Sequence, residues 1–192
     1  MKKLFLALLL PALSFAQDNA DKKVTGELKS NLFDLVVGKS VNVGYEYFLK
    51  GNQSLQLDLT AFDTYSYLDA SVLDENNLIG IQASYNIYFS KNKEHHGFVF
   101  YPFAKIRTGT QVISDYYYNF DPIEGDYNSV SKEVDLSGFE VGLGLGHKWL
   151  FNDKLSLGVG AQIGRNLTSD QEFRDNYGEI NFKTNVTLGI RF

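Results

Sequence analysis

Apolar and polar residues alternate one by one along most of this chain, and that alternation constrains the fold more than any other feature. In the segment Ile79–Phe89, one face carries Ile79, Ile81, Ala83, Tyr85, Ile87 and Phe89, and the other carries Gly80, Gln82, Ser84, Asn86 and Tyr88. Successive side chains of a β-strand point to opposite faces, so this period predicts a strand between two different surroundings. Its length suits a tilted transmembrane strand, which needs about 9–11 residues.

Seven further segments repeat the pattern, at residues 24–33, 41–49, 55–61, 98–107, 139–149, 155–164 and 180–192. Pro102 interrupts the fourth of these, and we expect a β-bulge there because proline cannot donate a ladder hydrogen bond. Short connections at 50–53, 91–96 and 151–154 alternate with long ones at 63–77, 109–136 and 166–179, while the connection at 34–40 is also short. Outer-membrane barrels pair short periplasmic turns with longer external loops. The sequence therefore predicts an all-β protein, an eight-stranded antiparallel up-and-down transmembrane β-barrel.

The first residues have the layout of a secretory signal peptide. Lys2 and Lys3 precede an apolar run at 4–13, and small side chains stand at Ser14 and Ala16. The run is too short for a membrane-spanning helix, which needs about 20 residues. We expect cleavage after Ala16, leaving residues 17–192 as one barrel domain. Removing the two lysines changes the formal charge of the chain from −5 to −7, and an acidic chain argues against nucleic acid as a partner.

The polar face decides which side of the barrel meets lipid. A lipocalin-like soluble barrel would turn its polar face to water and carry mostly Lys and Glu there. Here that face is rich in Gly, Asn and Ser, which suit the crowded interior of a small barrel, so we expect the apolar face to meet lipid. The charged residues that this arrangement places inside are Glu27, Lys29, Glu46, Asp58, Lys105, Arg107, Glu140, Lys148, Arg165, Lys183 and Arg191. They would form either an ion or solute path or, as we favour, a packed polar core.

Several aromatic residues fall on the outward face near strand ends. They are Tyr45, Tyr47, Phe89, Phe98, Trp149 and the C-terminal Phe192. Amphipathic aromatic side chains favour the headgroup zone, so we expect the first five to belong to an aromatic girdle. His147 lies two positions from Trp149 on the same face, where interface anchoring is a simpler role than catalysis.

With these features the whole mature chain resembles the small outer-membrane β-barrels of the OmpA-transmembrane and OmpX type, and more closely uncharacterised barrels common in Bacteroidota. The motifs that carry the resemblance are Val43-Gly44-Tyr45-Glu46-Tyr47, the glycine-rich stretch at 142–149, Gly158-Val159-Gly160 and the final Phe192. The resemblance implies eight strands and insertion by the barrel-assembly machinery, for which Phe192 would be the assembly signal. It assigns no activity.

The long connections are acidic, with 14 Asp or Glu against Lys132 and Arg174. A solvated surface explains most of these charges. Asp121, Glu124 and Asp126 are also possible oxygen ligands for a divalent cation, although their spacing fits no EF-hand loop. Tyrosines cluster in the same connection, at 116–118 and 127, and either form an adhesive surface or pack over the barrel mouth.

Lipid A acylases and deacylases are the enzymes to consider on so small a barrel, but they need a nucleophile or base beside a groove for acyl chains. His95 and His96 lie in an expected periplasmic turn, and the interior is too charged for an acyl chain. We expect no enzyme activity, no catalytic residue, no cofactor and no metal site. The predicted function is a non-enzymatic outer-membrane protein with a structural or surface-interaction role, and the alternative is a narrow pore or an accessory subunit of an envelope complex. Its expected surroundings are outer-membrane lipid and lipopolysaccharide, with the assembly machinery during insertion.

Overall fold

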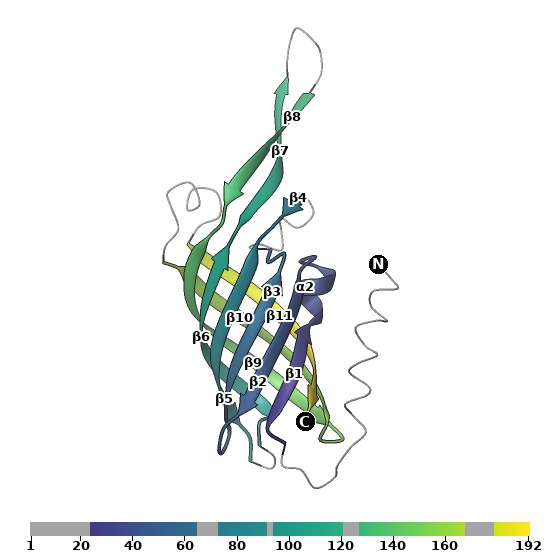
Figure 1. The fold of residues 1–192 in the computed structure, drawn as a ribbon, viewed down its shortest axis with the longest axis vertical. Coiled ribbons are helices and arrows are strands. Elements are labelled where there is room, and N and C mark those ends of the chain that lie inside the picture. Colours follow the sequence, from purple (N-terminus) through teal and green to yellow (C-terminus); the bar gives the residue numbers. More distant parts are fainter. Residues whose placement is uncertain (1–23, 65–72, 92–93, 121–126, 168–178) are drawn as a thin grey trace.

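A closed antiparallel barrel of eight strands forms the body of the computed structural model (Figure 1). The structure describes residues 24–64, 73–91, 94–120, 127–167 and 179–192. Around the barrel the strands follow the order β1-β11-β10-β9-β6-β5-β3-β2. Their bounds are β1 Gly26–Asn31, β2 Val41–Phe48, β3 Gln53–Ala61, β5 Ile79–Phe89, β6 Gly97–Thr108, β9 Gly138–Phe151, β10 Leu155–Asn166 and β11 Ile180–Arg191. The predicted fold class is confirmed.

Two of the expected connections contain secondary structure that the sequence did not predict. The segment at 109–136 forms β7 Thr110–Phe120 and β8 Tyr127–Asp135, and the segment at 63–77 contains β4 Leu73–Asn76. These three strands make a second sheet in the order β4-β7-β8, which projects from one end of the barrel (Figure 1). The prediction of plain loops was wrong because a sheet outside the barrel needs no apolar face toward lipid, so its strands lack the alternation that marks the others.

A short helix occupies the connection between the first two barrel strands, where only a loop was expected. Helix α2, Leu32–Val36, begins after Asn31, whose side-chain oxygen accepts a hydrogen bond of 3.1 Å from the backbone N–H of Phe33. This N-cap satisfies one of the donors that a helix start leaves unpaired. Asp34 in its first turn is buried. The helix thus delivers a carboxylate to the end of the barrel.

Pro102 lies in β6 without the bulge that the sequence suggested. Its partner on β9 is Leu143, within an unbroken ladder. On the β5 side the ladder is interrupted, but the pairs on either side of the interruption, Ser84 with Phe103 and Ile87 with Phe100, keep the same register. Because proline lacks an N–H, β6 loses pairing with β5 beside Pro102, but the register of the two strands is unchanged. The predicted bulge was therefore wrong.

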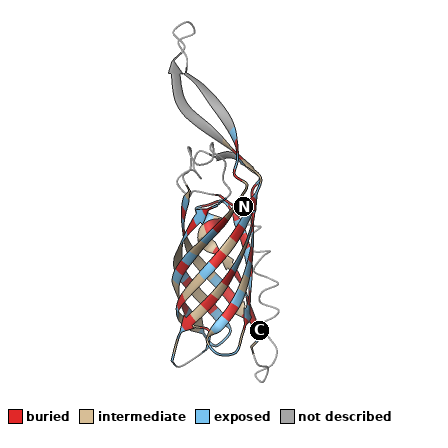
Figure 2. Cartoon of the chain, turned by 90° about the vertical axis from the view of Figure 1, so that its left-hand side faces the viewer, coloured by how far each residue is buried: buried red, intermediate tan, exposed pale blue. Residues whose placement is uncertain are grey.

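The barrel is inverted relative to a soluble protein, with polar side chains inside and apolar ones outside (Figure 2). Along β2 the burial alternates strictly, with Asn42, Gly44 and Glu46 buried between exposed neighbours. Leu57, at the middle of β3, is 56% exposed. Burial therefore follows the strand period that the sequence showed. Within the described residues no helix combines the length and the apolar character needed to cross a membrane.

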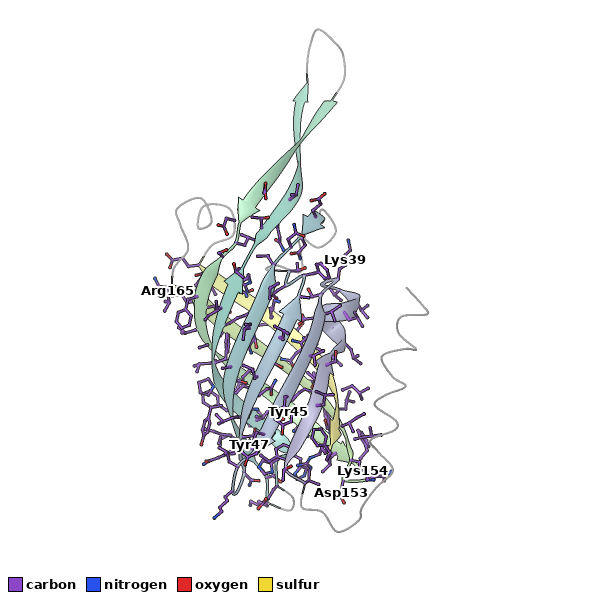
Figure 3. The ribbon with its side chains drawn as sticks, viewed as in Figure 1. Lys39, Tyr45, Tyr47, Asp153, Lys154 and Arg165 are labelled. Atoms are coloured by element: carbon purple, nitrogen blue, oxygen red, sulfur yellow. The ribbon has the colours of Figure 1, made fainter. Side chains whose placement is uncertain are left out.

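The barrel has two distinct ends. The turn end holds the three short turns, after β2, β5 and β9, together with the start of β1 and the C-terminus. The loop end holds α2 and the second sheet. Figure 3 shows Tyr45, Tyr47, Asp153 and Lys154 toward the turn end and Lys39 and Arg165 toward the loop end. These names are used for the two ends below.

Glycine lets one aromatic ring lie flat against the inner wall. Gly144 on β9 pairs with Tyr101 on β6, and a Cβ atom at position 144 would overlap the Tyr101 ring. The Tyr101 hydroxyl accepts a hydrogen bond of 3.1 Å from the side-chain amide of Asn185 on β11. Aromatic side chains laid across strand glycines help to fix register. This pair ties β6, β9 and β11 together across the lumen.

The second sheet grows directly out of the barrel wall. Gly109, with φ of 126°, links β6 to β7, and its backbone N–H donates to the Ser137 hydroxyl at 3.1 Å. Leu78, Val134 and Leu136 form a small buried apolar cluster at this junction. The base of the β7–β8 hairpin is therefore packed and hydrogen-bonded.

Candidate functional site: the charged lumen and its two ends

Among the described residues, the charged side chains buried in the barrel lumen are equal in number for each sign. The buried acids are Glu27, Asp34, Glu46, Asp58, Asp63 and Glu140, and the buried bases are Lys29, Lys105, Arg107, Lys148, Lys183 and Arg191. The alternating pattern alone gave four acids against seven bases. Two differences between the predicted and the observed lumen account for the change in these numbers. Asp34 and Asp63 turn inward from connections, and Arg165 lies outside the lumen, 65% exposed and 2.8 Å from Glu179.

Asp63 is the centre of the ion cluster at the loop end. Its carboxylate lies 2.5 Å from the ammonium of Lys105 and 2.8 Å from that of Lys183. It also accepts a hydrogen bond of 2.9 Å from Nε of Arg107. Burial alone would raise the pKa of Asp63, but Lys105, Lys183 and Arg107 outweigh it and hold that pKa well below the ordinary range.

Glu140 extends this cluster across the lumen. Its Oε2 atom accepts from Arg107 at 3.3 Å and from the side-chain amide of Asn181 at 3.1 Å. The loop-end cluster, defined as Asp63, Lys105, Arg107, Glu140 and Lys183, thereby links β6, β9 and β11 with the connection after β3.

Glu46 is the corresponding centre toward the turn end. Its Oε2 atom lies 2.6 Å from Lys29 and 3.0 Å from Lys148, and Lys148 also lies 2.8 Å from Glu27. Arg191 approaches the same Glu27 carboxylate, at 3.8 Å. These five residues are called the turn-end cluster.

Neutral donors complete the coordination of Glu46. Its other oxygen, Oε1, accepts hydrogen bonds from the Ser54 hydroxyl, from the Tyr88 hydroxyl at 2.5 Å and from the Asn86 amide at 3.3 Å. A buried charge is tolerated when opposite charges and hydrogen bonds replace its hydration. Glu46 meets both conditions, so the cluster is a connected network that fixes the relative positions of β1, β2, β3, β5 and β9.

An aromatic layer closes the lumen below this network. The rings of Phe48 and His95 stack at 4.3 Å, and Tyr88 meets the His95 ring edge-on at 6.0 Å. Nε2 of His95 lies 2.9 Å from the Gln53 carbonyl and 3.2 Å from that of Leu49, so it donates to the turn between β2 and β3. Burial lowers the pKa of His95, which favours this neutral form.

Between the two clusters lies a polar cavity of about 110 Å³. Asp58, on its wall, accepts two hydrogen bonds from the Gln56 amide, at 2.9 and 2.7 Å. Gln82 and Gln162 exchange hydrogen bonds across the lumen at 3.3 and 3.1 Å. A polar space of this size accommodates several waters, since one needs about 10–15 Å³. The two ion-paired layers therefore enclose a polar cavity with room for several waters.

The predicted outward aromatic residues all lie toward the turn end. Tyr45, Tyr47, Phe89, Phe98 and Trp149 are exposed on the outer face. The rings of Phe89 and Phe98 lie 5.8 Å apart, and the ring of Trp149 lies 4.4 Å from that of His147 on the same face. Their role as a girdle stays a prediction.

Phe192, the predicted assembly signal, closes the barrel seam. Its carbonyl accepts from the backbone N–H groups of Thr25 and Gly26 at 3.0 and 3.2 Å, and its ring stacks on Tyr45 at 6.1 Å. The contacts account for a structural role of this residue, while recognition by assembly machinery remains a prediction.

The possible cation ligands Asp121, Glu124 and Asp126, and the side chains of the tyrosine cluster, lie outside what the structure describes. Within the described part, no three His, Cys, Asp or Glu side chains gather as a metal site. His96 forms a hydrogen bond of 2.9 Å with Ser90 in a turn at the turn end.

Asp63 is the residue that sequence reasoning missed. It was counted among the acids of a solvated loop because it follows the last alternating residue of its strand. A signal was present, however, because seven inward bases against four acids is a costly imbalance in a dry lumen. The excess of bases implied that acids from the connections turn inward.

No protein-family model and no curated protein matches the chain. Among solved structures it is similar to the N-terminal β-barrel domain of Pseudomonas aeruginosa OprF, with a TM-score of 0.44 and 14% identity over 88% of this chain and 96% of that one. It is also similar to Neisserial surface protein A, with a TM-score of 0.44 and 10% identity over 88% of this chain and 92% of that one.

Proposed function

We propose that this chain is a non-enzymatic outer-membrane barrel with a closed lumen that presents the β7–β8 hairpin for interactions at the cell surface. The observation that carries the proposal is the second sheet, which projects from the loop end of the barrel (Figure 1). The turn end then faces the periplasm, and the loop end faces outward.

The outer face of the barrel supports the membrane location. Leu57, Leu145 and Ile163 are all more than half exposed, on three different strands. A soluble protein rarely exposes so continuous an apolar surface. In a bilayer the closed ladder satisfies the backbone hydrogen bonds of the wall internally, apart from the interruption between β5 and β6 beside Pro102, as a spanning structure must.

The lumen supports a closed barrel over an open pore. Ion-paired layers lie on both sides of the central cavity, and each contains a carboxylate that bonds to at least two cations. Opening either layer would separate buried opposite charges, which is costly. In planar bilayers the purified protein is expected to give no reproducible single-channel steps. Steady steps would contradict the closed lumen and favour a narrow pore, for which the central cavity would be the conducting space.

The hairpin supports the interaction role. β8 lies at an edge of the second sheet in the described part of the chain, so one row of its backbone groups is unpaired there. An exposed edge is a surface on which an extended segment of another protein can add a strand. The packed base formed by Leu78, Val134 and Leu136 holds that edge away from the barrel.

A hairpin-shortened variant tests the proposal. It replaces residues 113–132 by a two-residue Asn-Gly turn and keeps the base of the hairpin. Binding of expressing cells to immobilised extracellular proteins should fall to the level of cells without the protein, while heat-modifiable mobility on gels stays unchanged. A matched control replaces Lys50 and Lys154, at the opposite end, by Gln. Equal binding by intact and shortened proteins would contradict the interaction role.

A further inference from the structure

A bowl of about 690 Å³ opens at the turn end, below the aromatic layer. Phe48, His95 and Arg191 line its inner part, and Lys50, Glu94 and Asp153 belong to the turns around it. The bowl is separate from the central cavity and from the hairpin. Its inner lining joins an aromatic ring to a guanidinium group.

Arg191 is buried but poorly satisfied. Only 8% of it is exposed, and among the described residues its Nε atom has no hydrogen-bond partner. The nearest carboxylate oxygen, on Glu27, is 3.8 Å away, which is too far for a hydrogen bond. The guanidinium carbon stands 4.4 Å from the centre of the Phe48 ring, which lines the bowl. Arg191 is therefore a lining residue of the bowl, and its guanidinium group lies against an aromatic ring of the same wall.

The other members of the turn-end cluster do not need Arg191. Glu27 takes hydrogen bonds from Lys148 at 2.8 Å and from the Ser156 hydroxyl at 2.5 Å. Glu46 is bound by Lys29 and Lys148. The cluster contains three cations and two carboxylates, and the surplus positive charge is the one beside the bowl. Asp34 and Asp58, the two acids that bring the described lumen to neutrality, line the central cavity instead.

Charge and geometry together indicate the missing partner. A buried guanidinium without hydrogen bonds is costly, and its planar fork of donors matches a carboxylate. A monoanion neutralises the one surplus positive charge of the turn-end cluster. A dianion such as phosphate is disfavoured because Glu94 and Asp153 already place negative charge at the bowl. The stacked rings of Phe48 and His95 offer an apolar floor beside it.

We propose that the turn-end bowl binds a small ligand through a carboxylate group, with Arg191 as the binding residue, and that the ligand is of the amino acid or short peptide class. Such a ligand places its carboxylate on Arg191 and its ammonium toward the acids of the rim. That the ligand comes from the periplasm rests on the proposed function, whereas the chemistry of the bowl does not.

The test uses the mature chain in detergent micelles and follows the Arg191 Nε–H resonance by NMR. Triglycine is the probe, and its C-terminal amide is the matched control ligand. Triglycine should shift this resonance saturably, while the amide should leave it in place. Arg191→Gln should weaken binding about thirtyfold or more, because truncating one partner of a buried charge contact costs at least about 2 kcal/mol. Arg165→Gln, which changes an exposed arginine at the loop end, should not.

A second variant covers the case in which Arg191→Gln does not fold. Phe48→Leu keeps the guanidinium but removes the ring beneath it, and it should weaken triglycine binding about threefold, in line with the energy of a cation–π contact. Unchanged affinity in the variant that folds would overturn the assignment.

Equal shifts of the Arg191 resonance with triglycine and with its amide would overturn the proposal, as would tighter binding of inorganic phosphate than of triglycine. It would also be overturned if removal of residues 17–23 abolished a preexisting contact of Arg191, because that segment of the chain would then be the occupant. The hairpin-shortened variant should bind triglycine as the intact chain does, so failure of the surface role and failure of this site are distinguishable.

Discussion

Asp63→Asn removes one negative charge that three buried cations share. The substitution preserves side-chain size, but the amide cannot neutralise Lys105, Lys183 and Arg107, which lie within 2.9 Å of the carboxylate. Removing one partner of a buried ion pair costs about 3–5 kcal/mol, because the remaining charge is left uncompensated. The three contacts are not additive, so we expect a loss near this range and not a multiple of it.

Urea unfolding in lipid vesicles measures this loss, with the heat-modifiable gel band as the readout of folded barrel. Glu179→Gln is the matched control, since it breaks the exposed bridge to Arg165, worth about 0–1 kcal/mol. Lys183→Met in the Asp63→Asn background should recover part of the loss by removing one of the three cations that lost this carboxylate. The reasoning would be refuted if Asp63→Asn and Glu179→Gln reduced the unfolding free energy equally.

Three more substitutions probe the lumen, the outer wall of the barrel and the aromatic layer at the turn end. Gly144→Val should cost about 1–3 kcal/mol by forcing the Tyr101 ring off the wall, and Tyr101→Leu should relieve part of it in the same urea assay; no loss would contradict the close packing. Leu57→Lys should cost about 2–4 kcal/mol in vesicles, since it places a charge at mid-membrane on the lipid face, and a neutral effect would count against that face. For His95, burial lowers the pKa in the folded state, so the unfolded chain binds more protons and stability falls as the pH drops below about 6.5. His95→Gln should therefore lose less stability than the wild type between about pH 7.5 and pH 5, and an equal loss would exclude this residue as the cause.

The barrel wall was predictable because lipid and lumen impose opposite demands on successive residues. β5 matches its predicted bounds, and the inward positions of Glu46, Lys105 and Lys148 follow from the same period. Beyond the wall that constraint ends. β7 and β8 have no lipid-facing side, so nothing in their sequence required apolar alternation.

The lumen was only partly predictable for the same reason. Alternation identifies inward residues within strands, but it is silent about a connection that folds back, as those bearing Asp34 and Asp63 do. Arg165 shows the opposite error, because a residue near a strand end can leave the lumen for a partner such as Glu179. Charge balance over the whole interior is the physical rule that would have corrected both.

The equal numbers of buried acids and bases have an electrical consequence. A membrane potential acts on net charge with about 2.3 kcal/mol per elementary charge per 100 mV. Among the described residues, six buried charges of each sign sum to zero, ten of them in the two clusters and two, Asp34 and Asp58, at the central cavity. A voltage therefore exerts almost no net force on them. The twelve formal charges described inside the barrel thus present almost no net charge to a membrane potential.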